Sequence, residues 1–231
     1  MLNFSAAPLQ QLIEARGWKK LSEFRRIGAI YEYVRDEILF GYNADDSRTA
    51  EQVLADGLGQ CNTKGTLLMA LLRGCGIPCR VHGFTIDKQL QYGAMTGIVY
   101  RNAPNDVFHT WVEVLYKEQW LPLEGVILDR MYLTALQKRY QAQNGSFLGY
   151  GVAVQDFQHP PIEWKGEATY IQSDGINNDF GVWDDPDSLL EKHHQVMSPA
   201  KEFAYKHLGR HLMNYNVRKI RRTYRPDMRE E

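Results

Sequence analysis

The segment from Gly57 to Pro78 constrains the fold of this chain more than any other. It opens with a Gly-Leu-Gly-Gln turn, reaches Cys61, continues with an apolar stripe and closes with glycines before the proline. The stripe repeats every three or four residues and consists of Leu67, Leu68, Leu71 and Leu72. This spacing predicts a helix from Cys61 to Gly74 with one buried face. The fold must therefore be built around a helix whose first residue is a cysteine.

Alternation with a period of two follows this helix and predicts strands. The segments with this pattern are residues 80–86, 96–100, 108–116 and 119–123. Lys117 and Glu118 separate the last two, which is the length of a hairpin turn and predicts antiparallel pairing. Upstream, apolar spacing predicts a helix through residues 20–40, and Thr49 can cap a short helix over residues 50–54. Together these patterns predict an α+β fold in which the cysteine helix packs on a small antiparallel sheet, with extra helices around it.

Length and composition fit a single domain. The 231 residues are 44% hydrophobic and 24% charged, close to globular averages, so the chain has material for one buried core. We expect residues 1–140 to form this core. Residues 141–231 follow a helical run at 133–140 and are rich in loops and segregated charge. We expect them to form an extension packed on the same domain, with a frayed end over the last six residues. The sequence assigns no function to this extension.

Charge and hydropathy argue against several classes of protein. A formal net charge of −1 is not that of a chain built mainly to bind nucleic acid. The longest apolar runs, such as residues 67–72, are much shorter than the roughly 18–20 residues that cross a bilayer. The first twenty residues lack the basic start and apolar stretch of a secretory signal. Three cysteines cannot form a fully paired disulfide framework, which favours free thiols in a reducing compartment. We therefore expect a cytoplasmic protein without a membrane span.

The remaining charged clusters lack the patterns of metal or nucleic-acid sites. His207 and His211 are four residues apart, but no glutamate lies between them as the zinc-hydrolase motif requires. Residues 174–179 lack the glycine and the closing glutamate of a calcium loop. The basic run at 218–225 is typical of a solvated helix face, whereas the acidic run at 174–191 could dock a basic partner. We expect no metal, no cofactor and no nucleic-acid partner.

Cys61 has the local environment of a reactive thiol. The unpaired amides and the dipole at a helix N-terminus stabilise a thiolate, which favours a lowered cysteine pKa. A thiol nucleophile whose reaction ends in protonation of a leaving amine needs an imidazole nearby. His109, near the start of an apolar strand, is the first candidate, and His82 is its competitor. A carboxylate should then orient the imidazole, and Glu124 or Asp129 could do so.

Three ordered blocks resemble the transglutaminase-like superfamily. Residues 59–80 are similar to its core motif, which runs Gly-x-Cys, a helix, and then Leu-Arg-x-x-Gly-Ile-Pro-x-Arg. Residues 109–114 resemble its His-x-Trp-x-Glu strand, and residues 120–124 resemble its Trp-x-x-Leu-Asp segment. The resemblance spans residues 27–130 and implies a papain/transglutaminase-like core of the small bacterial type. It also implies a catalytic triad, whose nucleophile, base and orienting carboxylate would be Cys61, His109 and Glu124.

The third block departs from the family pattern at Glu124, because the family usually has aspartate there. The glutamate side chain is one methylene longer, so Asp129 stays open as the residue that orients His109. The resemblance also implies an oxyanion hole, for which we expect the Cys61 backbone amide and one side-chain donor. The candidates for oxyanion or supporting roles are Gln60, Tyr42, Trp111 and Asp129.

This resemblance implies acyl transfer from an amide through a thioester on Cys61. Water as the acceptor gives hydrolysis, as in a protease, amidase or deamidase, and an amine gives transamidation. Hydrolysis is slightly favoured, because water is always present and the sequence has no motif for a second substrate. The alternatives are an amide-forming acyltransferase and an inactive binding or scaffold protein. The expected substrate is a peptide, a protein or a small amide, and the sequence does not indicate an oligomeric state.

Overall fold

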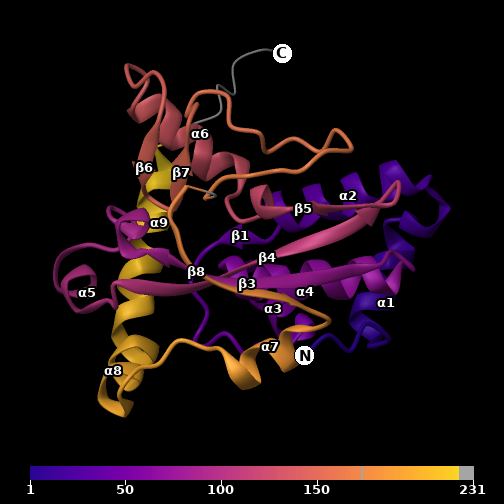
Figure 1. Ribbon diagram of the computed structural model, residues 1–231, viewed down its shortest axis with the longest axis horizontal. Helices are drawn as coiled ribbons and strands as arrows, with labels where there is room; N and C mark the ends of the chain where they lie inside the picture. The colour runs from indigo at the N-terminus through magenta and orange to yellow at the C-terminus, as the bar shows by residue number, and fades with distance from the viewer. Residues whose placement is uncertain (173, 224–231) are drawn as a thin grey trace.

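The computed structural model describes residues 1–172 and 174–223, and Figure 1 shows their arrangement. The helices are α1 (Ala7–Ala15), α2 (Glu23–Asp36), α3 (Ala50–Asp56), α4 (Cys61–Gly74), α5 (Gly97–Asn102), α6 (Arg130–Arg139), α7 (Pro186–Lys192), α8 (Pro199–Ala204) and α9 (Arg210–Arg222). The strands are β1 (Leu39–Phe40), β2 (Leu58–Gly59), β3 (Cys79–Asp87), β4 (Asp106–Tyr116), β5 (Gln119–Pro122), β6 (Phe147–Gly149), β7 (Val152–Val154) and β8 (Ile176–Trp183). Single helical turns lie at Trp18–Lys20, Lys88–Gln91, Glu124–Val126 and Tyr205–Gly209.

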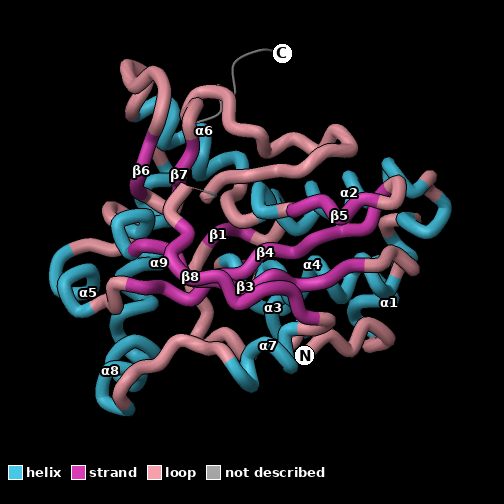
Figure 2. The backbone as a smooth tube through the Cα atoms, viewed as in Figure 1, coloured by secondary structure: helices cyan, strands magenta, loops and turns pink. Residues whose placement is uncertain are grey.

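A four-stranded antiparallel sheet forms the middle of the molecule, as the strands in Figure 2 show. Its strand order is β5-β4-β3-β8, and His109 on β4 lies opposite Phe84 on β3. Helix α4 packs against β4 and is surrounded by α1, α2 and α3. The predicted α+β fold, with a cysteine-led helix on a small antiparallel sheet, is therefore confirmed.

Helix α4 begins at Cys61 and ends at Gly74, as its sequence predicts. Every residue from Asn62 to Leu72 is buried. The helix therefore lies at the centre of the core and is buried on all sides, not on one face as the sequence predicts. Its one buried cation is Lys64, whose Nζ donates to the backbone oxygens of Arg35 and Ile127 at 3.0 Å each. Burial lowers the pKa of Lys64 to about 7.

Two local predictions on either side of the core are also confirmed. Thr49 caps α3, because its side chain accepts from the Gln52 amide. Strands β4 and β5 form the expected hairpin through Lys117 and Glu118, with φ angles of 48° and 64°. Positive φ at both central residues matches the twist of antiparallel strands, although neither residue is the glycine or asparagine that such turns favour.

The strand prediction for residues 96–100 is wrong. These residues start helix α5, with Thr96 as its N-cap and none of its side chains buried. The Ile-Val-Tyr sequence has strand propensity, but that propensity counts only where a neighbouring strand and a buried face exist. In this exposed segment the backbone is satisfied locally instead, as when the Ala103 amide donates to the Val99 oxygen at 3.0 Å.

The segment after residue 140 supplies β8, which the sequence did not predict. This strand lies within the acidic run and pairs with β3 along one edge of the sheet. Its Asn, Asp and Gly residues hide the period-two pattern, and as an edge strand it is paired on one side. Further along, α8, a π-turn at Tyr205–Gly209 and α9 run in succession down one end of the molecule (Figure 1). The expected fraying of the last six residues lies outside the described residues.

Within residues 1–172 and 174–223, no helix is both long and apolar enough to cross a membrane.

Candidate functional site

The nucleophile candidate lies at the tip of α4. Cys61 is half-buried, whereas Cys75 and Cys79 are buried. Its thiol donates to the Asn62 side-chain oxygen at 3.4 Å. Its backbone amide belongs to the first turn of the helix, where amides have no partner within the helix and can face a ligand.

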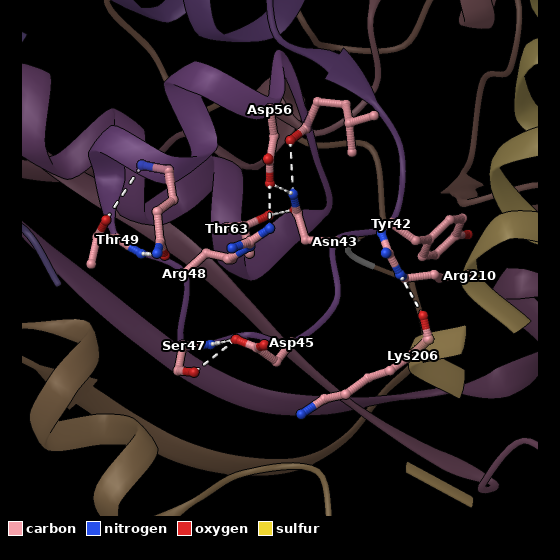
Figure 3. Close-up of polar contacts among 12 residues, drawn as sticks. Tyr42, Asn43, Asp45, Ser47, Arg48, Thr49, Asp56, Thr63, Lys206 and Arg210 are labelled. Carbon is pink, nitrogen blue, oxygen red and sulfur yellow. Dashed lines mark hydrogen bonds and ion pairs between the residues drawn. The ribbon is translucent and has the colours of Figure 1, made fainter. Parts of the chain in front are cut away.

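A polar network pins the turn before Cys61. The Gln60 amide donates to Thr63 Oγ1 at 3.1 Å, and the Thr63 hydroxyl donates to Asn43 Oδ1 at 2.6 Å. Asn43 in turn donates to Asp56 at 2.9 Å, as Figure 3 shows. Gly59 is required here, because a Cβ at this position would lie 2.7 Å from Thr63 Oγ1. The first turn of α4 and the loop after residue 42 therefore hold one another in place.

His109 is buried on β4, at 1% exposure, with its ring 4.9 Å from that of Phe84. Its Nε2 lies 3.4 Å from Glu124 Oε1, an ion-pair separation rather than a short hydrogen bond. The other ring nitrogen, Nδ1, has no hydrogen-bond partner among the described residues. Burial alone would lower the pKa of His109, but the charge of Cys61, followed by Glu124, raises it to about 9.

Glu124 is fully buried in the turn that follows β5. Its Oε2 accepts from the backbone amides of Ile171 at 3.0 Å and Gln172 at 2.9 Å. Its own amide donates to the Thr169 oxygen at 3.1 Å, so the turn at Glu124 is hydrogen-bonded to the segment at residues 169–172 in both directions. Amide donors on one carboxylate oxygen direct the other, Oε1, at His109. The longer glutamate fits because a distant segment of the chain fixes its end.

Asp129 takes no part in this arrangement. Its carboxylate caps α6 by accepting from the Tyr132 amide at 2.9 Å, and it accepts from the Phe40 amide at 2.9 Å. It also forms a buried ion pair with Arg221, whose Nη2 lies 2.5 Å from Oδ2. All of its contacts are structural. Of the two carboxylates that the sequence left open, the structure places Glu124 beside His109.

His82, the competing imidazole, is held elsewhere. Its Nδ1 lies 3.1 Å from Glu113 and its Nε2 lies 2.7 Å from Asp179, and these two carboxylates raise its pKa against the effect of burial. Trp111 donates to the same Glu113 at 3.2 Å. Its ring centroid is 4.5 Å from that of Phe84, the ring that also contacts His109. Trp111 therefore supports His109 through Phe84 rather than directly.

Tyr42 and Gln60, the two predicted side-chain donors of the oxyanion hole, differ in whether they keep a hydrogen for a ligand. Tyr42 donates its single hydroxyl proton to Gln91 at 2.9 Å. Gln60 accepts from the Asn43 amide through Oε1 and donates through Nε2 to Asp46 at 3.0 Å. A primary amide has two hydrogens, so Gln60 keeps one for a ligand, whereas Tyr42 keeps none without breaking its bond.

Two residues near the nucleophile were missed from the sequence. Asp46 accepts from Gln60, and burial raises its pKa. Tyr205, in the π-turn before α9, donates to the Asn43 oxygen at 3.0 Å. Burial, with the charges of Asp46 and Cys61 adding to it, raises the Tyr205 pKa. Figure 3 shows the neighbouring Lys206 and Arg210 across from the same loop. The polar stretch around Asp46 carries no catalytic motif, and no sequence signal near Tyr205 pointed to the site.

No group of three or more His, Cys, Asp and Glu side chains that could hold a metal ion occurs in the described part of the chain. The pair His207 and His211 and the acidic run around residue 174 form no such group there.

Parts of the chain are similar to known proteins. Residues 14–125 match the family model described as the transglutaminase-like superfamily. A stretch of 69 residues is 36% identical to the uncharacterized protein YebA of Bacillus subtilis (strain 168), covering 29% of this chain and 9% of that protein. A crystal structure of a candidate cysteine protease from Cytophaga hutchinsonii has 15% sequence identity and a TM-score of 0.43, over 78% of this chain and 43% of that one. The chain thus spans well under two thirds of either relative.

Proposed function

Because residues 14–125 match the model of the transglutaminase-like superfamily, we propose that the chain is a cysteine enzyme that acts on amide bonds through a thioester on Cys61. One observation carries the proposal: a buried imidazole lies 3.4 Å from a buried carboxylate, and the charge of a half-buried cysteine at a helix tip acts on the same imidazole. We assign Cys61 as nucleophile, His109 as proton carrier and Glu124 as the group that orients His109. The substrate is an amide in a peptide, a protein or a small molecule.

The first half of the reaction forms the thioester. His109 takes the thiol proton of Cys61, and the sulfur attacks the amide carbonyl carbon. The oxygen that becomes negative is stabilised by the Cys61 backbone amide and the remaining hydrogen of Gln60. The carbon–nitrogen bond then breaks, and the His109 imidazolium gives its proton to the departing amine. A His109 pKa of about 9 keeps that proton available at neutral pH.

The second half releases the acyl group. Water or an amine attacks the thioester, His109 removes a proton from the attacking group, and the thiol of Cys61 is regenerated. We favour water, which makes the enzyme a hydrolase. Release to an amine would make it an amide-forming acyltransferase, and the same site serves both reactions.

The test is to trap the acyl-enzyme. The wild-type protein is treated with p-nitrophenyl acetate, and the acylated residue is identified by peptide mass spectrometry. We expect the acetyl group on Cys61 and no acylation in Cys61→Ala. Cys75→Ala and Cys79→Ala serve as matched controls and should behave as wild type, because both thiols are buried and burial raises the pKa of Cys79 to about 11. Equal acylation of Cys61→Ala, or none in any form, would instead support an inactive binding protein.

A further inference from the structure

The side chain of Asn62, the residue directly after the nucleophile, holds the sulfur of Cys61. Its Oδ1 accepts from the Cys61 thiol at 3.4 Å and from the Thr110 hydroxyl at 3.0 Å. Thr110 follows His109 on β4, so one buried carboxamide joins the tip of α4 to the strand that carries the proposed base. The two ring nitrogens of His109 have no hydrogen-bond partner in the described part of the chain. The hydrogen bond of the thiol therefore goes to Asn62 and not to the imidazole.

The carboxamide of Asn62 is fixed with its oxygen toward the sulfur. Its NH2 group donates to Asp46, and an ionised carboxylate can only accept hydrogen bonds. The space behind the carboxamide is nearly closed, because the hollow between Asn62, Thr110 and the side chains of α7 measures about 10 Å³, room for about one water. Cys61, by contrast, is half-buried. Of the two partners, the sulfur is therefore the one that can turn away, by rotation about its own Cα–Cβ bond.

An amide oxygen in this position favours the neutral thiol over the thiolate. The S–H group donates to the oxygen, whereas an ionised sulfur would place its negative charge against the oxygen lone pairs. A hydrogen bond made only to the neutral form of an acid opposes its ionisation. The helix N-terminus acts in the opposite direction, because its amides and dipole stabilise negative charge. The titratable side chains on which the charge of Cys61 acts are His109, Tyr42 and Tyr205, and Asp46 lies behind Asn62.

We propose that Asn62 is a positioning residue that holds Cys61 in a resting, protonated state, and that acyl transfer begins when the sulfur turns from Asn62 Oδ1 to the imidazole of His109. In that step the S–H···O hydrogen bond breaks and the proton passes from the sulfur to a ring nitrogen. The electron pair left on the sulfur then attacks the carbonyl carbon. Because the thiolate and not the thiol is the nucleophile, the resting sulfur is protected from alkylating agents. The role of His109 rests on the proposed function, but the hold on the thiol does not require turnover.

The hold on the thiol is tested without a substrate. The rate at which iodoacetamide alkylates Cys61 is followed by peptide mass spectrometry across about pH 5 to 10 in wild type and in Asn62→Ala. Removing the acceptor should lower the pH of half-maximal alkylation by up to about one unit and raise the rate at neutral pH about two- to tenfold, the equivalent of one neutral hydrogen bond. An unchanged or higher midpoint, which is what a purely structural role predicts, overturns the inference. If Asn62→Ala does not fold, Asn62→Ser replaces it, because a hydroxyl can donate to an ionised sulfur and the midpoint should again fall.

Thr66→Val is the matched control. Thr66 is buried, and its hydroxyl donates to the backbone oxygen of Asn62 at 3.1 Å. The substitution therefore removes a hydrogen bond to the same residue but leaves its carboxamide in place, and the midpoint should stay that of wild type. Neither substitution removes a titratable group near the sulfur. An equal fall of the midpoint in both variants would show that loosening of the first turn of α4 is the cause, and would overturn the role of the carboxamide.

Acylation by p-nitrophenyl acetate separates this inference from the proposed function. At neutral pH, Asn62→Ala should form the acetyl-enzyme faster than wild type by a factor similar to that of alkylation, because fewer sulfurs are held as thiols. A lowered midpoint with slower acylation overturns the turning step. A lowered midpoint without any acetyl-enzyme in either protein overturns the proposed function and leaves the hold on the thiol standing. Formation of the acetyl-enzyme with an unchanged midpoint in Asn62→Ala does the reverse.

Discussion

Two carboxylates are buried completely, Glu124 in the turn at Glu124–Val126 and Asp129 at the N-cap of α6. They differ in how many hydrogen bonds the rest of the molecule gives them. Both carboxylate oxygens of Asp129 accept hydrogen bonds, from two backbone amides and from the Arg221 guanidinium. Glu124 is half-saturated, because two amides hold Oε2 while Oε1 has no hydrogen bond among the described residues.

This difference separates a structural carboxylate from the one that we propose as functional. A buried acceptor without a hydrogen bond costs stability, and folded proteins tolerate it mainly where the group has another task. The task of Glu124 is the ion-pair contact with His109. The task of Asp129 is to join α6, β1 and α9. Substitutions that separate the two tasks test the comparison.

The largest effect should come from Glu124→Gln. The glutamine oxygen should stay on the Ile171 and Gln172 amides, so its NH2 group faces His109 Nε2 and forces the proton onto Nδ1. An imidazole with that tautomer cannot take the proton of Cys61. We expect a loss of about 10³–10⁴-fold in the rate of acyl-enzyme formation, with a change in unfolding free energy of about 1 kcal/mol or less. A near-normal rate would show that Glu124 does not orient His109.

Next comes Asp129→Asn, with the opposite pattern. It leaves the Arg221 charge buried without its partner, which typically costs about 3–5 kcal/mol of unfolding free energy, measurable by urea denaturation. The acylation rate of the folded fraction should stay near wild type. The double variant Asp129→Asn with Arg221→Met is the control and should recover part of the stability. Loss of acylation in a stably folded Asp129→Asn protein would contradict the separation.

Glu124→Asp should have an intermediate effect. The aspartate of the family pattern is one methylene shorter, so here it cannot reach both the two amides and His109 at once. A misplacement of about 1 Å at a catalytic group costs up to about 100-fold, and we expect a loss of about 10- to 100-fold in acyl-enzyme formation. An unimpaired rate would mean that the Ile171 and Gln172 amides are not what positions this carboxylate.

The smallest effect concerns pH. The folded-state pKa of His109, about 9, lies above the ordinary value of about 6.5, so the folded protein holds this proton more tightly than the unfolded chain. Its contribution to the unfolding free energy is therefore fully present below about pH 6.5 and is lost as the pH rises through 9. Glu124→Gln should reduce the slope of the unfolding free energy against pH by less than about 1.4 kcal/mol per pH unit, the limit for one proton.

The effect is measured as the difference in unfolding free energy between wild type and Glu124→Gln, obtained from urea denaturation at several pH values. Lys64 has a slope of opposite sign, because its folded-state pKa of about 7 lies below the ordinary value, and it is present in both proteins. Asp129→Asn should leave the His109 slope in place. Identical pH profiles for wild type and Glu124→Gln would show that Glu124 does not act on the imidazole.

The parts of this molecule that the sequence predicted are those whose cause is local. The start of α4 at Cys61, the cap at Thr49 and the turn at Lys117 and Glu118 each depend on residues within a few positions. The placement of α4 on the antiparallel sheet followed from the order of helix and strand patterns. The proximity of His109 and Glu124 followed from the family resemblance, and their catalytic roles stay predictions.

What could not be predicted depends on partners far along the chain. The donors to Glu124 are backbone amides, which every residue except proline has, so no side chain marks positions 171 and 172. In the sequence, Asp129 was a second candidate, after Glu124, to orient His109. Its actual partner, Arg221, lies ninety-two positions later in the chain. Residues 96–100 had strand-forming side chains, but no strand lies beside them in the described chain to make use of them.

The hydrogen bonds from the backbone amides of residues 171 and 172 to Glu124 also bear on how fragments of this chain would behave. A fragment that ends near residue 140 would contain cysteine, histidine and glutamate, and a motif search would accept it as complete. It would nevertheless lack the clamp on the glutamate and the guanidinium on Asp129. Adding back residues 141–231 as a separate polypeptide should restore acylation if the two halves reassociate. Under the proposed mechanism, the ability to form an acyl-enzyme would belong to the two segments together and not to the half that carries the motifs.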